Sequence, residues 1–264
     1  MRAPRARQQG VGVAELDVRR WGAGSPVVLV HGSIVGAERT WRAQRPLGEH
    51  WALIAPNRPG YGDSPPLARS DFELEAPLIA ELLGDGAHLV GQSYGGVIAL
   101  LCAAQRPEAV RSLTVCEPGA LRIARANPDV AAAIETGNEL FRRRHELAPD
   151  ALLRAFRANT GSTRATPTRL PDWLARGMAL LMSERPSWEA DIPLAELART
   201  GFPKLVVSGG HSAVFDAVCD VLEQSLGAER AVIGGRGHTI PAAGAPFNAR
   251  LHAFLAASEA RRPR

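Results

Sequence analysis

A serine stands between two glycines in the segment GQSYG, residues 91–95. The apolar residues 88–90 before it are typical of a short buried strand, and residues 97–105 after it are typical of a helix. A chain that turns sharply from strand to helix here places the Ser93 hydroxyl at the tip of the turn, in front of the free N–H groups of the helix. Glycine is needed on both sides because a side chain there would collide with the neighbouring strand and helix. The pattern predicts a nucleophilic serine; the alternative is a turn with only a structural role.

A serine hydroxyl is a weak nucleophile at neutral pH, so a base must take its proton. His238 is the best candidate of the seven histidines, because it ends the glycine-rich segment GRGH after the last expected strand and follows Ser93 in the chain. His211, which also follows an expected strand, is the alternative base. The other five histidines are expected to have packing or surface roles: His31, His50, His88, His145 and His252.

Short β-branched runs alternate with longer amphipathic runs along most of the chain, which predicts a mostly parallel sheet covered on both faces. Strands are expected at residues 11–21 (an edge strand), 27–30, 51–55, 88–90, 110–116, 205–208 and 231–233. Helices are expected between them at residues 40–49, 72–83, 97–105, 214–226 and 246–257.

The alternation is interrupted in the middle of the chain, where only helical stretches are found, at residues 130–146, 149–159, 172–183 and 193–199. We therefore expect a doubly wound α/β core of residues 1–119 and 200–264, with a helical cap of residues 120–199 inserted into it. Open α/β sheets bind ligands outside the carboxyl ends of their strands, which is where such a cap would lie.

Together these segments resemble the α/β-hydrolase fold family over nearly the whole chain. The resemblance rests on four motifs in the family's order, each at an expected strand end: HG at 31–32, RPGYGDS at 58–64, GQSYG at 91–95 and GRGH at 235–238. It implies a serine hydrolase with Ser93 as the nucleophile and His238 as the general base. It also implies an oxyanion site made of two main-chain N–H groups, those of Tyr94 and Ser33, with Ile34 next in line.

A carboxylate must orient the histidine and stabilise its charged form. In the family this acid commonly follows the strand that corresponds to residues 205–208, but here the next residues are GGHS and include no carboxylate. Glu117, directly after the strand at 110–116, keeps the family's order of nucleophile, acid and histidine, and we favour it as the acid. Asp216 is the alternative, although it is expected to lie within a helix and point away.

Large apolar residues at helical spacing in the expected cap predict an apolar pocket, with Ile34, Trp173 and Met178 as substrate contacts. The expected reaction is hydrolysis of a small to medium carboxylic ester or lactone through an acyl-enzyme. One alternative is a cofactor-free reaction other than hydrolysis, such as a lyase or cyclase reaction, on the same triad. A binding protein that keeps the fold is a second alternative, but such proteins usually lose the serine or the histidine.

Composition narrows the partners to a small molecule. A net charge of +4 with only 5% aromatic residues argues against nucleic-acid binding, which favours basic residues interleaved with aromatic ones. No apolar run is long enough to cross a membrane or form a secretion signal, and the three cysteines are widely spaced, so we expect a soluble, cytoplasmic protein without disulfides. Metal and nucleotide motifs such as HExxH, CxxC and GK[ST] are not found, so no metal or cofactor is expected.

Overall fold

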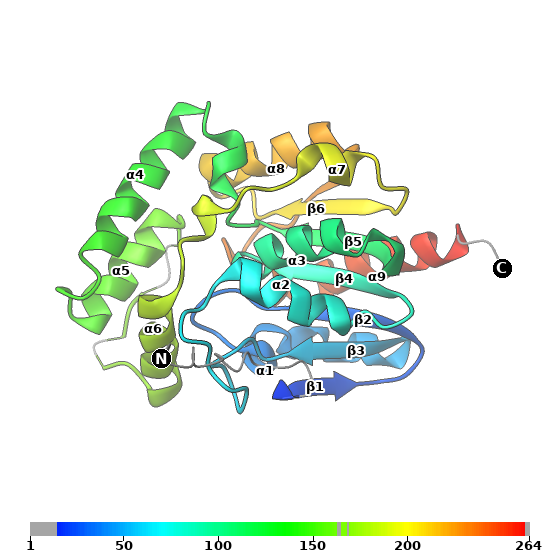
Figure 1. Cartoon of the computed structure of the whole chain (residues 1–264), viewed down its shortest axis with the longest axis horizontal. Coiled ribbons are helices and arrows are strands. Elements are labelled where there is room, and N and C mark those ends of the chain that lie inside the picture. The colour runs from blue at the N-terminus through cyan, green and yellow to red at the C-terminus, as the bar shows by residue number, and fades with distance from the viewer. Residues whose placement is uncertain (1–14, 163–164, 168, 262–264) are drawn as a thin grey trace, which may run out of the picture.

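The computed structural model describes residues 15–162, 165–167 and 169–261. Its strands form one sheet in the order β1-β3-β2-β4-β5-β6-β7, in which β1 is antiparallel to β3 and the other neighbours are parallel (Figure 1). The strands are β1 (Val18–Trp21), β2 (Ser25–Val30), β3 (Trp51–Pro56), β4 (Ala87–Gln92), β5 (Val110–Cys116), β6 (Lys204–Ser208) and β7 (Glu229–Val232). The predicted α/β fold class, a mostly parallel doubly wound sheet, is confirmed.

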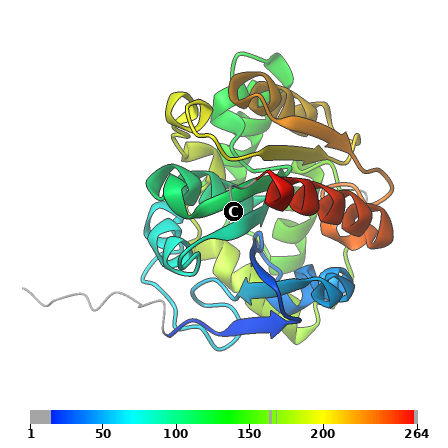
Figure 2. The ribbon, with the colours of Figure 1, turned by 90° about the vertical axis from the view of Figure 1, so that its right-hand side faces the viewer.

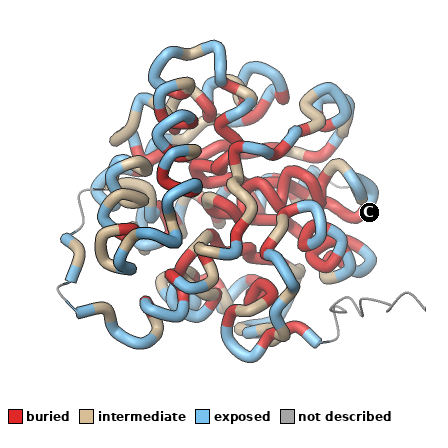
Figure 3. Tube along the Cα trace, turned by 60° about the vertical axis from the view of Figure 1, so that its left-hand side comes forward, coloured by how far each residue is buried: buried red, intermediate tan, exposed pale blue. Residues whose placement is uncertain are grey.

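Helices cover both faces of this sheet (Figure 2). One face carries α2 (Phe72–Glu81), α3 (Tyr94–Gln105) and α8 (Ala213–Leu226), whose apolar side chains belong to one core cluster. The other face carries α1 (Ala37–Thr40), η2 (Arg42–Glu49), η6 (Ile240–Ala243) and α9 (Ala245–Ala260), which contribute to a second cluster. Because both faces are covered, every residue of β4 and β6 is buried. Buried residues are concentrated in the interior of the molecule, drawn red in Figure 3.

Between β5 and β6 the described residues form helices and no strand of the sheet. They are η4 (Leu121–Ala124), α4 (Pro128–Arg142), α5 (Pro149–Asn159), α6 (Asp172–Ser183), η5 (Ser187–Glu189) and α7 (Leu194–Ala198). Helices α4, α5 and α6 lie beyond one end of the sheet (Figure 1). Side chains from α4 and α5 line a pocket with Ser93, which follows β4, so this end is the carboxyl end of the parallel strands.

Four local expectations differ from the structure. The helix expected at residues 130–146 is α4, which begins at Pro128 and ends at Arg142. The helix expected at residues 40–49 is split into the short α1 and the 3-10 helix η2, which contains Pro46 and so lacks one N–H donor. The edge strand expected at residues 11–21 is β1 from Val18, and residues 11–14 lie outside the described part of the chain. The last strand begins and ends earlier than the expected 231–233.

In the described part of the chain, no helix combines the length and the apolar character that crossing a bilayer requires. The three cysteines, Cys102, Cys116 and Cys219, are buried free thiols. Burial raises the pKa of Cys102 and of Cys219 to about 12. These thiols are therefore packing residues rather than reactive ones.

Candidate active site

Ser93 occupies the turn between β4 and α3, with φ 55° and ψ −120°. The turn is tight enough that a Cβ placed on Gly91 would lie 2.3 Å from the carbonyl oxygen of Gly95. A Cβ on Gly95 would in turn lie 2.3 Å from the carbonyl oxygen of Val30, at the end of β2. The two glycines therefore allow the backbone contacts that hold Ser93 at the tip of the turn.

Backbone strain is concentrated around this turn. In the described part of the chain, the non-glycine residues with positive φ are Ile34 (71°), Ser93 (55°) and Glu117 (39°). Each follows a different parallel strand, β2, β4 or β5, at its carboxyl end. Such conformations cost about 1–3 kcal/mol each and persist only where the surrounding structure holds them, typically at functional sites.

The structure brings Ser93, His238 and Glu117 into one hydrogen-bonded row. The Ser93 Oγ lies 2.8 Å from Nε2 of His238, and Nδ1 of the same ring lies 2.8 Å from Oε2 of Glu117. A carboxylate accepts but does not donate, so these partners select the tautomer with its hydrogen on Nδ1. The lone pair of Nε2 then faces the serine hydroxyl, as removal of its proton requires.

Glu117 is itself fixed from the other side. Its side chain is fully buried, and Oε1 accepts a hydrogen bond from the Gly209 N–H at 2.6 Å. The other candidate acid, Asp216, lies in α8 and pairs with Arg230 at 3.2 Å. Of the two carboxylates considered from the sequence, the structure places Glu117 against His238 and turns Asp216 to another partner.

His211, the alternative base, also lies beside Glu117. Its Nδ1 is 3.3 Å from Oε1 of Glu117, and its Nε2 is 3.3 Å from the carbonyl oxygen of Thr160, after α5. The hydrogen bond to Ser93 comes from His238 instead. His211 thus lies between Glu117 and the end of α5, in the GGHS stretch after β6 that contains no carboxylate.

Phe215 is a contact of the site that the sequence analysis did not identify. Its ring stacks on that of His238, with the centroids 4.3 Å apart and the planes at 24°. The ring lies near the start of α8, where a Phe in an apolar helical run has no distinguishing signal. Stacking restricts the imidazole to one plane and shields it from water.

The loop after β2 passes close to the nucleophile, since a Cβ on Gly32 would lie 2.9 Å from Cβ of Ser93. His31 anchors this loop: Nε2 accepts from the Arg58 N–H at 3.0 Å, and Nδ1 donates to the Gly32 carbonyl at 2.8 Å. Burial, together with the nearby Arg58 charge, lowers the pKa of His31 to about 3. The ring therefore stays neutral and serves as a structural link, as expected from the sequence.

The expected oxyanion residues Ser33 and Tyr94 both line the pocket above Ser93. Ile34 was the next candidate for an oxyanion donor. Its N–H instead donates to the Tyr61 hydroxyl at 2.9 Å and so is not free to bind an oxyanion. The main-chain N–H groups of Ser33 and Tyr94 therefore stay the predicted oxyanion pair.

The pocket has both aromatic and polar lining residues. Its cavity volume is about 40 Å³, within about 510 Å³ of space between the lining atoms that includes open solvent. Its apolar lining consists of Leu121, Phe141, Phe156, Trp188, Val214 and Phe215. Its polar lining beyond Ser93 includes Ser33, Asn159, Thr160, Glu184 and Ser187.

The three expected substrate contacts lie outside this lining. Met178 and Ile34 are almost fully buried in the core, and the backbone of Ile34 packs directly against Gly177 of α6. Trp173 is half-buried, with the Arg39 guanidinium 4.4 Å from its ring centroid. The apolar face of α6 thus packs on the loop after β2, and the apolar side chains between β5 and β6 that reach the pocket come from η4, α4, α5 and η5.

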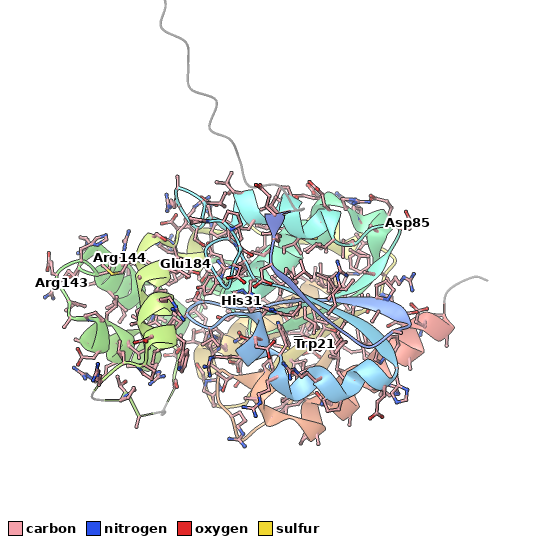
Figure 4. The ribbon with its side chains drawn as sticks, turned by 90° about the horizontal axis from the view of Figure 1, so that it is seen from below. Trp21, His31, Asp85, Arg143, Arg144 and Glu184 are labelled. Atoms are coloured by element: carbon pink, nitrogen blue, oxygen red, sulfur yellow. The ribbon has the colours of Figure 1, made fainter. Side chains whose placement is uncertain are left out.

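Behind the loop lies a buried charge cluster. Arg58 donates from Nε to Glu75 at 2.7 Å and from Nη1 and Nη2 to Glu184, both at 3.1 Å. Figure 4 shows Glu184 where the helical segment meets the sheet, on the side of His31 and far from Asp85. The cluster therefore ties the loop after β2 to the end of α6.

Replacing Arg58 with leucine is expected to lower the free energy of unfolding by about 3–5 kcal/mol, because it leaves buried Glu75 without its cation. Chemical denaturation of wild type and variant measures this difference. Arg154→Leu is the matched control, since Arg154 pairs with Asp150 on the surface, and a much smaller change is expected there. Equal effects of the two substitutions would contradict the structural role given to Arg58.

Among residues 15–162, 165–167 and 169–261, no group of three or more His, Cys, Asp and Glu side chains has the arrangement of a metal site. The polar groups at Ser93 are instead arranged for proton transfer and nucleophilic attack.

A doubly wound sheet with a serine on a strained strand–helix turn, paired with a histidine from a later loop, defines the α/β-hydrolase class. A sequence profile of the α/β hydrolase fold matches residues 25–242, and the chain belongs to this family. The predicted family and the prediction of an enzyme are confirmed.

Among its relatives, a pimeloyl-[acyl-carrier protein] methyl ester esterase of Aeromonas salmonicida is 30% identical over 236 residues, which cover 83% of this chain and 89% of the relative. Lipase LipV of Mycobacterium tuberculosis is 27% identical over 253 residues, and the match covers 88% of this chain and 94% of the lipase. A thermophilic esterase from Thermogutta terrifontis has a similar structure, with a TM-score of 0.67 at 24% identity over 92% of this chain and 93% of its own.

Proposed function

We propose that the chain hydrolyses carboxylic esters through an acyl-enzyme formed on Ser93. The observation that carries the proposal is the hydrogen-bonded row of Ser93, His238 and Glu117, placed at the edge of a pocket. Its relatives include proteins named as an esterase and a lipase, which supports an ester as the substrate.

In the first half-reaction, Nε2 of His238 takes the Ser93 proton while Oγ attacks the ester carbonyl carbon. The carbonyl oxygen becomes an anion, which the N–H groups of Ser33 and Tyr94 stabilise. His238 then gives its proton to the departing alcohol. Water repeats the sequence on the acyl-enzyme, and Glu117 remains ionised throughout, balancing the charge of the imidazolium.

We infer that residues 120–199 act as the cap over this site and shape its selectivity. Phe141, Phe156 and Trp188, all from this segment, line the pocket. Their rings favour a small to medium apolar acyl or alcohol group, and a lactone of that size fits the same chemistry. Because all three cysteines are free thiols, we propose the cytoplasm as the place of action.

A series of p-nitrophenyl esters with increasing acyl length tests this proposal. We expect turnover by the wild type to rise from acetate to medium chains and to fall again once the acyl group outgrows the aromatic pocket. Ser93→Ala, measured with the same esters, is the control for spontaneous hydrolysis. Wild-type rates no higher than those of this variant across the whole series would contradict ester hydrolysis.

A further inference from the structure

The buried cluster behind the oxyanion loop contains one cation and two carboxylates. Arg58 is completely buried, as is Glu75, and Glu184 is 2% exposed. If all three were ionised, this cluster would hold an uncompensated negative charge in the protein interior. Such a charge is costly, and a buried carboxyl group instead takes up a proton.

The hydrogen bonds indicate which carboxyl carries the proton. Glu75 receives two bonds from Arg58, at 2.7 Å and 3.1 Å, and another from the Ser70 hydroxyl at 2.7 Å, as suits an ionised carboxylate. Glu184 meets Arg58 through Oε1 alone. Its Oε2 instead has the Ser33 hydroxyl as hydrogen-bond partner, at 2.5 Å, and either of these two oxygens can carry the hydrogen of such a bond.

Burial supports the same assignment. Desolvation is the largest effect and raises the pKa of Glu184; with the nearby Glu75 charge it outweighs the opposing effects of Arg58 and Ser33. The other titratable groups that face it are Glu75, Tyr61 and Tyr94. Burial raises the pKa of both tyrosines, so their phenols stay neutral over the range of an ordinary assay.

We propose that Glu184 is a neutral acid that donates to Ser33 Oγ, so that the Ser33 hydroxyl gives its own hydrogen to the substrate oxyanion. The inference rests on the proposed ester hydrolysis at Ser93. It adds to the two main-chain donors a third one, from a side chain. Ser33 is then a catalytic residue in its own right, and Glu184 is the positioning residue that orients its hydroxyl.

The direction of one hydrogen bond decides this role. A serine hydroxyl has a single hydrogen. If Glu184 were ionised, Ser33 would have to donate that hydrogen to it and would present only lone pairs to the developing anion. If Glu184 is neutral, its own O–H fills the 2.5 Å contact and the serine hydrogen is free to turn toward the pocket.

The position of Ser33 suits this donation. The residue lines the same pocket as Ser93 and Tyr94. Only three bonds separate the Oγ of a serine from its own main-chain nitrogen. The partner of this hydroxyl, Glu184, lines the same pocket, so the contact between them lies at the pocket wall.

Ser33→Ala and Glu184→Gln test the proposal together, because glutamine keeps an oxygen for Arg58 and places an N–H donor where the neutral acid has its O–H. We expect Ser33→Ala to lower kcat about 100-fold, with KM changed less than about threefold, as for loss of one oxyanion donor. A trifluoromethyl ketone that forms a tetrahedral adduct should bind more weakly by a similar factor. Glu184→Gln should lose no more than about a tenth as much activity as Ser33→Ala. Ser183→Ala, at an exposed serine one residue before Glu184, is the control for a serine-to-alanine change.

The pH profile gives the sign of the effect. The hydroxyl hydrogen is available while Glu184 is protonated, so wild-type kcat should decline as the pH rises through the raised pKa of Glu184. The part of this decline due to Glu184 should disappear in Glu184→Gln. Infrared difference spectra of the two proteins test the proton directly, without activity: the wild type should show the carbonyl band of a protonated carboxylic acid that the variant lacks.

An ionised Glu184 predicts the reverse pattern. Ser33→Ala would then leave kcat unchanged or raise it, and the acid band would be missing; either result overturns the proposal. If Ser33→Ala does not fold, Ser33→Thr, which keeps a hydroxyl, and Glu184→Gln still decide it through their pH profiles. Ser93-dependent turnover that is indifferent to Ser33 would refute this inference alone, whereas no Ser93-dependent turnover by the wild type would refute the proposed function.

Discussion

Replacing Ser93 by alanine is expected to lower kcat for ester hydrolysis on the order of 10⁶-fold, which leaves only the roughly 10³–10⁴-fold acceleration over water that substrate binding and the oxyanion donors provide. The substitution removes the atom that forms the covalent bond, and no other hydroxyl is placed 2.8 Å from His238 Nε2 in the described part of the chain. Because the pocket lining is otherwise unchanged, the variant should still bind substrate. Steady-state kinetics on the best ester of the series, with binding followed by calorimetry, measures both quantities.

The same experiment needs a control for the serine-to-alanine change itself. Ser183→Ala is this control, since the Ser183 side chain is exposed and donates a hydrogen bond to Leu180 of its own helix. We expect it to keep wild-type kinetics. A Ser93→Ala variant that retains more than about a hundredth of wild-type kcat would remove Ser93 from the mechanism.

The second large effect is expected at the acid. Glu117→Gln should lower kcat about 10⁴-fold, because an amide that keeps its bond to Gly209 N–H through oxygen offers Nδ1 of His238 an N–H donor. The imidazole would then hold its hydrogen on Nε2, facing Ser93, and would be unable to act as a base. The shape of the side chain is nearly unchanged, so the loss should appear in kcat much more than in stability.

Asp216→Asn is the matched control, since Asp216 is the other carboxylate that the sequence offers and its partner is Arg230. We expect its kcat to remain within about twofold of wild type, as for other exposed ion pairs. If Asp216→Asn lost activity and Glu117→Gln did not, the acid would have been assigned to the wrong residue.

Much of the site was predictable because its signals are local. The glycines around Ser93 and the glycine-rich segment that ends in His238 each predict a turn after a strand, and this prediction needs no information from the rest of the chain. Glu117 required more: its candidacy came from chain order and resemblance, and its contacts with Gly209 and His238 join residues 92 and 121 positions apart. No sequence pattern specifies such a pairing.

The substrate contacts were harder to predict for a different physical reason. An amphipathic helix shows which of its faces is apolar but not which neighbour covers that face. In α6 the neighbour is the loop after β2, so Met178 is buried in the core. Phe141 and Phe156 line the pocket instead, from helices with the same kind of pattern.

No sequence pattern indicated a role for Glu184. It stands alone after a helix, and its position becomes informative only when Arg58 and Ser33 lie against it. The role of a single polar residue in a buried cluster cannot in general be predicted from sequence, because it depends on charged residues that come from distant parts of the chain.

The central claim is that His238 activates Ser93, and the rate of covalent labelling by a fluorophosphonate tests it most directly. The wild type should take up one phosphonyl group, which peptide mapping places on Ser93, and His238→Ala should react at least about 10³-fold more slowly. Equal labelling rates in the two proteins, or modification at a residue other than Ser93, would contradict the account.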